Sequence, residues 1–278
     1  MIEIKLKGGL GNQMFQYSAG RHLSLKYKTD LVLNTEYFSN IPKGDVVRKY
    51  QLDIFNIDKN IKIKDKISPA QKLTLKIIFK LFGEKISYNI SALLLKLGFT
   101  AHLDGYFQSE KYFKDIRDTL LKEFTLTKNL GEEAKKIKDI LDKSEGVAIN
   151  IRRGDYLRPD YIKLYGSPTM EYYNQAILYI KNKFENPIFC IFSDDPEWVR
   201  KEFKIDGTIF AGNDILKDYE QMYLMSICKN NIIANSSFAW WGAWLNQNPN
   251  KVVIAPKQWT VAKSSDELDI LPENWIKI

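Results

Sequence analysis

The chain has 278 residues, of which 45% are hydrophobic, 13% aromatic and 27% charged, and its formal net charge is +7. This composition excludes a disordered chain, and the length predicts one large domain or two medium ones. No apolar run approaches the ~18–20 residues of a membrane-spanning helix, and early glycines interrupt any secretory signal. The two cysteines, Cys190 and Cys228, have no CxxC spacing and indicate a reduced, cytoplasmic protein.

The first half of the chain alternates β-rich runs with helical stretches. We expect strands at 2–6 and 30–34, an extended segment at 102–109, and helices at 13–25, 118–124 and 132–144. A new strand at 147–151 follows the last, highly charged helix. We therefore predict two domains, residues 1–145 and residues 146–278.

The positive charge is concentrated in the first domain, in an insertion at 59–98 that holds nine lysines against two acidic residues. Within it, residues 70–82 predict an amphipathic helix with Lys72, Lys76 and Lys80 on one stripe. Two interpretations stay open: an anionic membrane surface or an ordinary solvated helix face. Nucleic acid is not favoured, because the segment has no recognisable nucleic-acid motif and the stripe has no arginine.

The second half repeats the alternation of strands and helices. We expect strands at 147–151, 188–192, 207–212, 231–235 and 251–256, and helices at 170–184, from 195–196, at 218–229 and at 237–247. This order predicts an α/β fold with parallel sheets. Ligands of such folds bind beyond the carboxyl ends of the strands, so the loops that follow strands are the places to search for chemistry.

The first such loop is Gly8-Gly9-Leu10-Gly11-Asn12-Gln13. Gly9 and Gly11 would let the backbone approach a ligand, and the helix that follows favours an anion or sugar oxygens at its N-terminus. Met14 stands where a dinucleotide fingerprint needs its third glycine, and no Gly-Lys-Ser/Thr of a P-loop follows. A tight turn explains the glycines nearly as well.

The second loop carries two adjacent arginines, Arg152 and Arg153, directly after an apolar strand. Guanidinium groups bind diphosphate oxygens in pairs and stabilise the charge that develops on a leaving group. We expect Asp155 to hold one arginine in place. The alternative is a structural arginine–aspartate ion pair without a ligand.

Two further loops follow strands. Ser193, Asp194 and Asp195 predict a helix cap and ligand hydrogen bonds rather than a metal site, because Pro196 follows and no histidine or third carboxylate is near in sequence. The other loop leads into a helix whose first backbone N–H groups could bind phosphate, and its candidate residues are Asn235, Ser236, Ser237 and Phe238. The two tryptophans that follow belong either to the core or to a sugar pocket.

Together these segments resemble one family. GGLGNQMFQYSAG, GYFQSEKYF, NIRRGDY, FSDDPEW and MYLMSICKNNIIANSSFAWWGAWL are similar to the bacterial α-1,2-fucosyltransferases of glycosyltransferase family 11. The resemblance implies a GT-B fold, with two Rossmann-like domains whose parallel sheets face each other across a cleft. It implies an N-terminal acceptor-side domain, a C-terminal donor domain, and inverting, metal-independent transfer of L-fucose from GDP-fucose to a galactoside 2-hydroxyl.

The resemblance also implies roles for single residues. Arg152 matches the essential arginine of the family and Arg153 its neighbour, while Ser236 and Ser237 match the phosphate-binding turn. Asn12 matches an asparagine near the reaction centre. Asp160 is a candidate base for the acceptor hydroxyl by analogy with a distant fucosyltransferase. The product would belong to bacterial surface polysaccharide or lipopolysaccharide.

The sequence departs from the family at three positions, of which the first two help to recognise guanine in related enzymes. Asn150 replaces a usual histidine, Gln221 a usual aspartate, and Asn230 a frequent histidine. A carboxylate accepts from both guanine N1–H and the 2-amino group, whereas an amide pairs a donor with an acceptor and suits uracil or thymine as well. A dTDP-, UDP- or other deoxysugar nucleotide is therefore an alternative donor to GDP-fucose.

The expected partners are small molecules and glycans. They are a nucleotide sugar as substrate, with no further cofactor, and a galactose-containing oligosaccharide or lipid-linked glycan as acceptor. No nucleic acid is expected. The basic insertion adds a candidate peripheral contact with the inner face of the cytoplasmic membrane. A catalytically silent nucleotide- or glycan-binding protein is the alternative from another class, and the intact arginine pair argues against it.

Overall fold

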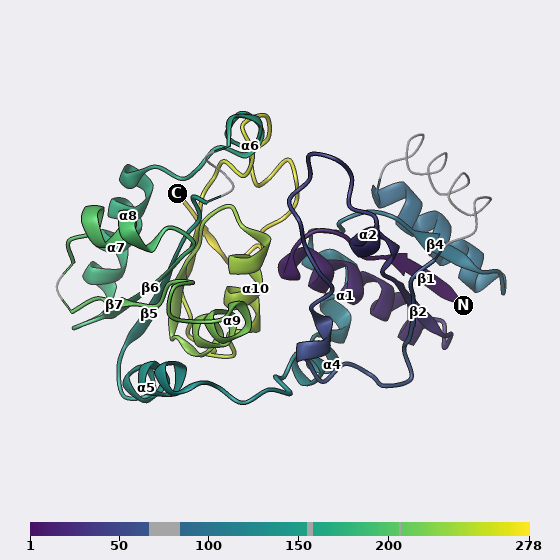
Figure 1. Ribbon diagram of the computed structural model, residues 1–278, viewed down its shortest axis with the longest axis horizontal. Helices are drawn as coiled ribbons and strands as arrows, with labels where there is room; N and C mark the ends of the chain where they lie inside the picture. Colours follow the sequence, from purple (N-terminus) through teal and green to yellow (C-terminus); the bar gives the residue numbers. More distant parts are fainter. Residues whose placement is uncertain (67–83, 155–157, 206) are drawn as a thin grey trace. The chain divides into compact units, whose positions relative to one another are not determined.

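The computed structural model describes residues 1–66, 84–154, 158–205 and 207–278. The predicted basic helix at 70–82 and Asp155 lie outside the described residues, as does the side chain of Asp160. The chain divides into two compact units, Met1–Thr127 and Lys128–Ile278 (Figure 1). Each unit is an α/β domain built on its own parallel sheet.

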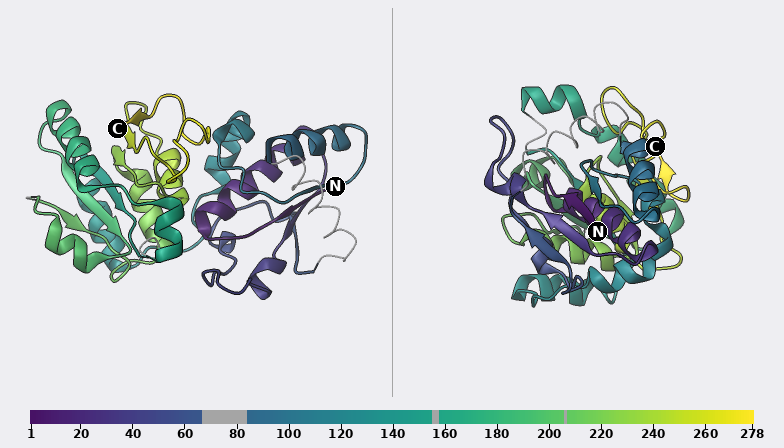
Figure 2. Two further views of the ribbon diagram at one scale, coloured as in Figure 1. Left: turned by 90° about the horizontal axis from the view of Figure 1, so that it is seen from above. Right: turned by 90° about the vertical axis from the view of Figure 1, so that its right-hand side faces the viewer.

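The first unit has a four-stranded sheet in the order β3-β2-β1-β4, with every neighbouring pair parallel. The strands are β1 (Ile2–Lys5), β2 (Leu31–Asn34), β3 (Lys62–Lys64) and β4 (Ala101–Leu103). Helix α1 (Leu10–Lys26) packs on this sheet against β1 and β2. Gly20 of α1 lies so near the sheet that an added Cβ would be 3.1 Å from Ile4 Cγ2. In Figure 2 the purple α1 runs along these strands.

Shorter helices complete the first unit. They are α2 (Glu36–Ser39), α4 (Arg117–Glu123), a helix at 84–96, and 3₁₀ turns at Leu52–Ile54, Glu110–Tyr112 and Lys114–Ile116. The helix at 84–96 packs on α1 through Tyr88, whose hydroxyl lies 2.6 Å from His22 Nδ1 and donates to the Tyr112 carbonyl. Burial lowers the pKa of His22, which therefore favours the neutral imidazole in this contact.

The second unit has a six-stranded sheet in the order β10-β9-β8-β5-β6-β7, again with parallel neighbours throughout. The strands are β5 (Gly146–Ile151), β6 (Ile188–Ser193), β7 (Ile209–Phe210), β8 (Asn230–Ile232), β9 (Val253–Ala255) and β10 (Ile276–Lys277). The two longest strands, β5 and β6, are buried along nearly their whole length, as expected of a sheet covered on two faces.

Helices cover both faces of this second sheet. Val147, Ile149 and Ile151 of β5 pack with α7 (Met170–Lys183) and α8 (Pro196–Glu202). Ala148, with the opposite orientation, packs with α5 (Glu132–Leu141) and α9 (Asp218–Ile227). Figure 1 shows these two layers on either side of the strands. Helix α10 (Ser237–Leu245) packs on α9, and α6 (Pro159–Tyr165) follows the loop after β5.

The predicted strands and helices occur in the predicted order, but the unit boundary differs and the structure adds elements, among them α2, α6 and the helix at 84–96. Helix α5, which the sequence analysis placed in the N-terminal domain, packs Ala134, Ile137 and Leu141 into the core of the second unit. Strands β3 and β10 have three and two residues and were not anticipated, because so short a run shows no periodicity. Within the described residues, the helices are too short or too polar for one to cross a membrane.

Candidate functional site

The centre of the second sheet is a topological switch point. The chain passes from β5 to β6 and β7 on one side and then returns to β8 on the other side of β5. The loops after β5 and β8 therefore diverge at the carboxyl edge, which is where open α/β sheets bind ligands. The arginine pair follows β5, and Asn235 and Ser236 follow β8.

Asp194 organises the loop after β5. Its Oδ1 accepts hydrogen bonds from the backbone N–H groups of Arg153, at 2.9 Å, and Gly154, at 3.1 Å. Its Oδ2 lies 2.7 Å from Arg152 Nη1. A Cβ at Gly154 would lie 2.6 Å from that same Oδ2, so a side chain at position 154 would displace the carboxylate. One aspartate thus fixes both the backbone of the loop and the first guanidinium.

Arg153 is held by different partners. Its Nε donates to Asp195 Oδ2 at 3.2 Å, and its guanidinium carbon lies 3.8 Å from the centroid of the Trp198 ring. The other oxygen of Asp195 accepts from the Trp198 backbone N–H, so Asp195 caps α8 as the sequence predicts. Because Asp195 engages only the Nε, the two terminal NH₂ groups of Arg153 make no described hydrogen bond and present a fork to an anion.

The predicted acids therefore bind the arginines in this structure. The loop is completed by Ser193, whose hydroxyl accepts from the Asp195 N–H at 3.0 Å. Both guanidinium groups remain partly accessible, with 26% of the Arg152 and 23% of the Arg153 side chain exposed. The arrangement combines the two sequence interpretations: arginine–aspartate ion pairs exist, and they hold guanidinium groups at an edge that solvent reaches.

Helix α10 brings backbone donors to the same edge of the sheet. Ser236 is its N-cap and is buried, and the Trp240 N–H donates to the Ser236 carbonyl at 2.9 Å. The backbone N–H groups of Ser237 and Phe238 belong to the first turn, which has no carbonyl of its own helix to bind. The side-chain amide of Asn235 donates to the carbonyls of Tyr165 and Trp259, both at 2.9 Å, and so anchors the turn.

The aromatic residues of α10 are structural. Trp240, Trp241 and Trp244 are fully or almost fully buried and contact one another, which confirms the core interpretation. The Trp240 indole N–H donates to the Ile270 carbonyl at 2.8 Å. Phe238 packs beside the core cluster that α5 and α9 form on the sheet.

Two amide side chains lie at the same end of the α9 face. Ala148 of β5 and Leu224 of α9 belong to one core cluster. Asn150 lies two residues after Ala148, on the same face of β5, and Gln221 lies one helical turn before Leu224. Asn150 is 6% exposed, and its buried Oδ1 makes no hydrogen bond with the described residues. Gln221 Nε2 donates to the Leu216 carbonyl at 3.2 Å.

The backbone of Asn150 is fixed by a hydrogen bond from α7. Its carbonyl accepts a hydrogen bond of 3.1 Å from the hydroxyl of Tyr173 on α7. Burial, and secondarily the charge of Asp194, raises the pKa of this phenol, so it remains a protonated donor. The end of β5, where the arginine loop begins, is therefore held from the α7 face of the sheet.

The glycine-rich loop of the first unit follows β1, the strand between β2 and β4. Gly8 has a φ of +78°, and a Cβ there would lie 2.6 Å from Asn12 Nδ2, so the turn requires glycine. Gly9 is the N-cap of α1, and Gly11 is buried in its first turn. The Oδ1 of Asn12 accepts from Gln108 Nε2 at 2.7 Å, which joins two of the family-like segments.

Two buried glutamines of α1 hold this loop. Gln13 Nε2 donates to the carbonyls of Gly8 and Lys49, and its Oε1 accepts from the Gln51 N–H. Gln16 accepts from the Lys7 N–H at 3.0 Å and donates to the Gly105 carbonyl at 3.2 Å. Neither role was predicted from the sequence. The available signal was a pair of amides, three residues apart, within an otherwise apolar helix stripe.

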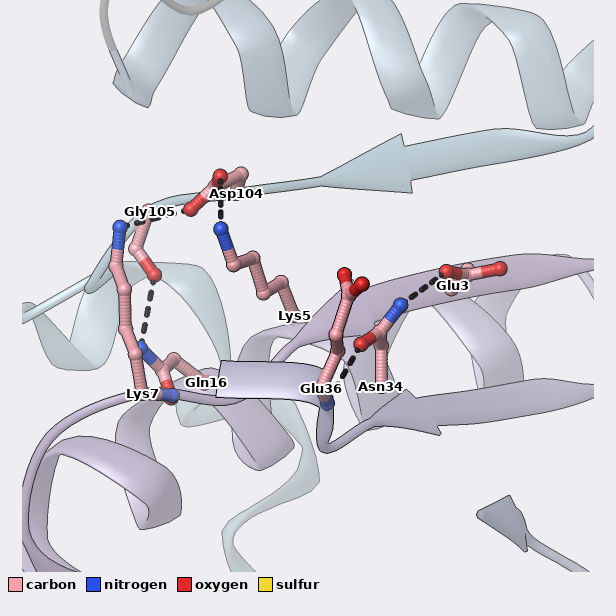
Figure 3. A network of polar contacts seen from close by, with 8 residues as sticks. All are labelled: Glu3, Lys5, Lys7, Gln16, Asn34, Glu36, Asp104 and Gly105. Atoms are coloured by element: carbon pink, nitrogen blue, oxygen red, sulfur yellow. Dashed lines mark hydrogen bonds and ion pairs between the residues drawn. The ribbon is translucent and has the colours of Figure 1, made fainter. Parts of the chain in front are cut away.

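Charged groups surround the same edge of the first sheet (Figure 3). Lys5 and Lys7 point at Asp104, with Nζ to carboxylate distances of 3.2 and 2.7 Å. Burial alone would raise the pKa of Asp104, but the two ammonium groups outweigh it and hold that pKa below its ordinary value. In the described part of the chain, no group of three or more His, Cys, Asp or Glu side chains could hold a metal ion.

Comparisons with known proteins agree over the full sequence. The model of glycosyl transferase family 11 matches residues 1–278. An alpha-1,2-colitosyltransferase of Escherichia coli is 33% identical over 300 residues, covering 100% of this chain and 99% of that protein. The O-antigen biosynthesis glycosyltransferase WbnK of Escherichia coli is 33% identical over 302 residues, covering 98% and 99%.

A solved structure supports the fold. The fucosyltransferase NodZ from Bradyrhizobium superposes with a TM-score of 0.50 at 11% sequence identity, covering 87% of this chain and 91% of that one. The shared fold is that of the GT-B glycosyltransferases, an α/β architecture with parallel sheets.

Proposed function

Because the chain belongs to glycosyl transferase family 11 and is a glycosyltransferase, we propose that it transfers a deoxyhexose from a nucleoside-diphosphate sugar to a galactoside 2-hydroxyl. The observation that carries the proposal is the position of Arg152 and Arg153, clamped by Asp194 and Asp195 at the switch point of the second sheet. The second unit is then the donor domain and the first unit the acceptor-side domain.

The proposed chemistry follows from the charges. Breaking the glycosidic bond of the donor leaves negative charge on the diphosphate while the sugar becomes oxocarbenium-like, so stabilising the leaving group lowers the barrier most. The guanidinium groups of Arg152 and Arg153 supply positive charge at fixed positions. The first-turn N–H groups of α10, including that of Ser237, add donors for a phosphate. We propose that these groups make a metal ion unnecessary, and that transfer persists in excess EDTA.

The acceptor hydroxyl loses a proton as it attacks the anomeric carbon from the face opposite the diphosphate, which inverts the configuration. Asp160, in α6, remains the candidate base for that proton. Replacing it with asparagine tests the role: loss of the acidic limb of the pH–rate profile supports it, and an unchanged profile refutes it.

We propose that the donor sugar belongs to the L-galacto 6-deoxy series. One relative is a colitosyltransferase. Colitose is fucose without its 3-hydroxyl, so the two sugars share the same 6-deoxy skeleton. The relatives also suggest that the product is part of an O-antigen or similar bacterial surface polysaccharide. A screen of nucleotide sugars with galactose-terminated acceptors, read by mass spectrometry, tests activity, sugar and acceptor together. No product with any 6-deoxyhexose donor would refute this function.

The nucleobase is a separate question with its own observation. Gln221 donates one of its two amide N–H groups to the Leu216 carbonyl, which leaves its Oε1 as an acceptor beside one N–H, and the buried Asn150 Oδ1 is a further acceptor. Acceptors suit guanine, whose N1–H and 2-amino group are donors. Guanine is therefore our first proposal. UDP or dTDP sugars are our second proposal, because the amides Asn150 and Gln221 replace the family's ionisable residues. Titration calorimetry with GDP, UDP and dTDP discriminates them by affinity.

A catalytically silent binding protein is the alternative from another class. A silent protein binds the nucleotide without cleaving it, so it has no use for groups that stabilise the leaving diphosphate. Arg152→Ala discriminates the two: an enzyme loses donor hydrolysis and transfer, whereas a silent protein shows neither activity before or after the substitution.

We propose that a peripheral membrane contact involves the helix at 84–96. Its buried positions are Ser87, Tyr88, Ser91 and Leu95, whereas the opposite stripe is apolar and outward: Ile86, Leu93 and Leu97 are 50–61% exposed. Lys85 and Lys96 flank this stripe in the charged insertion that holds the whole formal excess of the chain. Apolar side chains beside lysines suit an anionic lipid surface.

Vesicle binding tests this contact. The wild-type chain should sediment with phosphatidylglycerol vesicles and less with phosphatidylcholine vesicles, and added salt should weaken the binding. Leu93→Gln with Leu97→Gln should reduce it. Leu178→Gln is the matched control, because Leu178 is 59% exposed on α7 of the other unit. Equal binding by all three proteins would refute the contact.

A further inference from the structure

The loop after β4 in the first unit contains an unusual backbone position. Phe107 has a φ of +52°, in the left-handed region that favours glycine, yet its side chain is completely buried. Its ring contacts Tyr88 and Tyr112 at centroid distances of 6.0 and 5.4 Å. Strain of this kind persists where the surroundings determine the conformation, and it is frequent at ligand sites.

The surroundings that determine it are a carboxylate clamp. Glu84 accepts from the Tyr106 N–H at 2.5 Å through Oε1 and from the Phe107 N–H at 3.1 Å through Oε2. A Cβ at Gly105 would lie 2.9 Å from Glu84 Cγ, so the clamp also requires the glycine. The effect of the turn is to bury Phe107 and to leave Tyr106 outward, with 39% of its surface exposed.

The outward ring of Tyr106 is not loose. The Lys7 ammonium lies 4.8 Å from its centroid and is itself bound to Asp104 at 2.7 Å. On either side of Tyr106, the Gly105 carbonyl accepts from Gln16 and the Gln108 amide donates to Asn12. Figure 3 shows Lys7 directed at Asp104 and Gln16 directed at Gly105. Tyr106 is thus presented at the carboxyl edge of the first sheet, next to the glycine loop.

An accessible aromatic ring beside an ion pair is suited to a pyranose. The axial 4-hydroxyl of galactose leaves a continuous patch of C–H groups on one face of the sugar, and such a patch stacks on an aromatic ring. Lys7 donates and Asp104 accepts, so the pair matches sugar hydroxyls of either role. We infer that Tyr106 is the stacking platform of the acceptor site and binds the apolar face of a galactoside. This inference rests on the proposed function, which supplies the galactoside.

The test separates acceptor from donor. Tyr106→Ala should raise the acceptor KM about tenfold, as the loss of one aromatic contact predicts, while donor KM and donor hydrolysis without acceptor change less than twofold. Tyr106→Phe should keep the wild-type KM, because stacking needs the ring and not the hydroxyl. Tyr179→Ala is the matched control, since Tyr179 is 37% exposed on α7 of the second unit and should behave as wild type.

Direct binding gives a second readout. Saturation-transfer NMR with methyl β-D-galactoside should show strong contacts to H3, H4 and H5 of the sugar in wild type and Tyr106→Phe, and weak ones in Tyr106→Ala. An unchanged acceptor KM in Tyr106→Ala, an effect on donor KM instead, or equal losses in the Ala and Phe variants would each overturn the platform. Failure of the wild-type chain to glycosylate any galactoside would refute the proposed function.

Discussion

Two loops occupy corresponding places in the two units and are held by opposite chemistry. Each follows the strand at which the order of strands switches from one side to the other, β1 in the first unit and β5 in the second. The loop after β1 is held by amides, through Gln13, Gln16 and Gln108. The loop after β5 is held by carboxylates, through Asp194 and Asp195, which grip guanidinium groups.

The difference indicates which kind of ligand each loop is suited to bind. Carboxylates that fix arginines create a rigid cationic edge, which suits a diphosphate that gains charge during the reaction. Amides that fix a glycine turn create a rigid edge whose own clamping groups are neutral, and the flanking Lys7 is bound to Asp104. Such an edge suits a sugar, which carries no charge. Four substitutions test this contrast, given from the largest expected effect to the smallest.

Arg152→Lys should give the largest loss. A lysine keeps the charge but loses the planar fork that Asp194 orients, so the diphosphate is stabilised at one point only. We expect kcat to fall about 10²- to 10³-fold, the usual range for removing one preorganised donor, with little change in donor affinity. Steady-state transfer and donor titration measure the two quantities. Wild-type kcat in this variant would remove Arg152 from the reaction.

Asp194→Asn should be the next largest. An amide oxygen can still accept from the loop N–H groups, but it no longer holds the Arg152 guanidinium by charge, and a misplaced catalytic group loses about 10²-fold. Asp214→Asn is the matched control, because Asp214 pairs with Arg200 at 2.6 Å on the surface of the same unit and should change kcat less than twofold. Equal effects of the two substitutions would reduce the Asp194 contact to an ordinary surface pair.

Gln13→Leu should lower the free energy of unfolding, and it removes no charged group from the site. The substitution keeps the buried volume but leaves the carbonyls of Gly8 and Lys49 and the Gln51 N–H without their partner, and Gln13 is fully buried. We expect the free energy of unfolding to fall by about 2–3 kcal/mol. Urea denaturation followed by circular dichroism measures it. Gln175→Leu, at an exposed position of α7, controls for the loss of an amide and should be nearly neutral.

Local patterns predicted the frame of the molecule well. Strand β5 could be identified because its apolar run is long and ends in two arginines, and the cap at Asp195 because proline follows it. The partners of these residues could not be predicted, since Asp194 contacts Arg153 across 41 residues of sequence and only the pairing of β5 with β6 brings them together. The expected arginine partner, Asp155, lies outside the described residues.

The partners of the glycine loop in the first unit could not be predicted from the sequence either. Its glycines were identifiable, but the groups that hold them are glutamines, which have no characteristic spacing toward a distant loop. Gln16 meets Gly105 across 89 residues and Gln108 meets Asn12 across 96. The boundary of the two units depends on similar information, because α5 joins the second core through its apolar side and not through any change in composition.

Gln108→Ala should give the smallest effect, and it tests whether the amide clamp matters to the reaction at all. One neutral hydrogen bond is worth about 1 kcal/mol, so releasing Asn12 should lower kcat about fivefold if Asn12 acts near the reacting sugar. Asn12→Ala alone should cost at least as much, and the double variant should resemble Asn12→Ala, since Gln108 then has nothing left to orient. Additive losses would instead mean that Gln108 acts independently of Asn12. The contrast between the two loops would then hold for stability and not for catalysis.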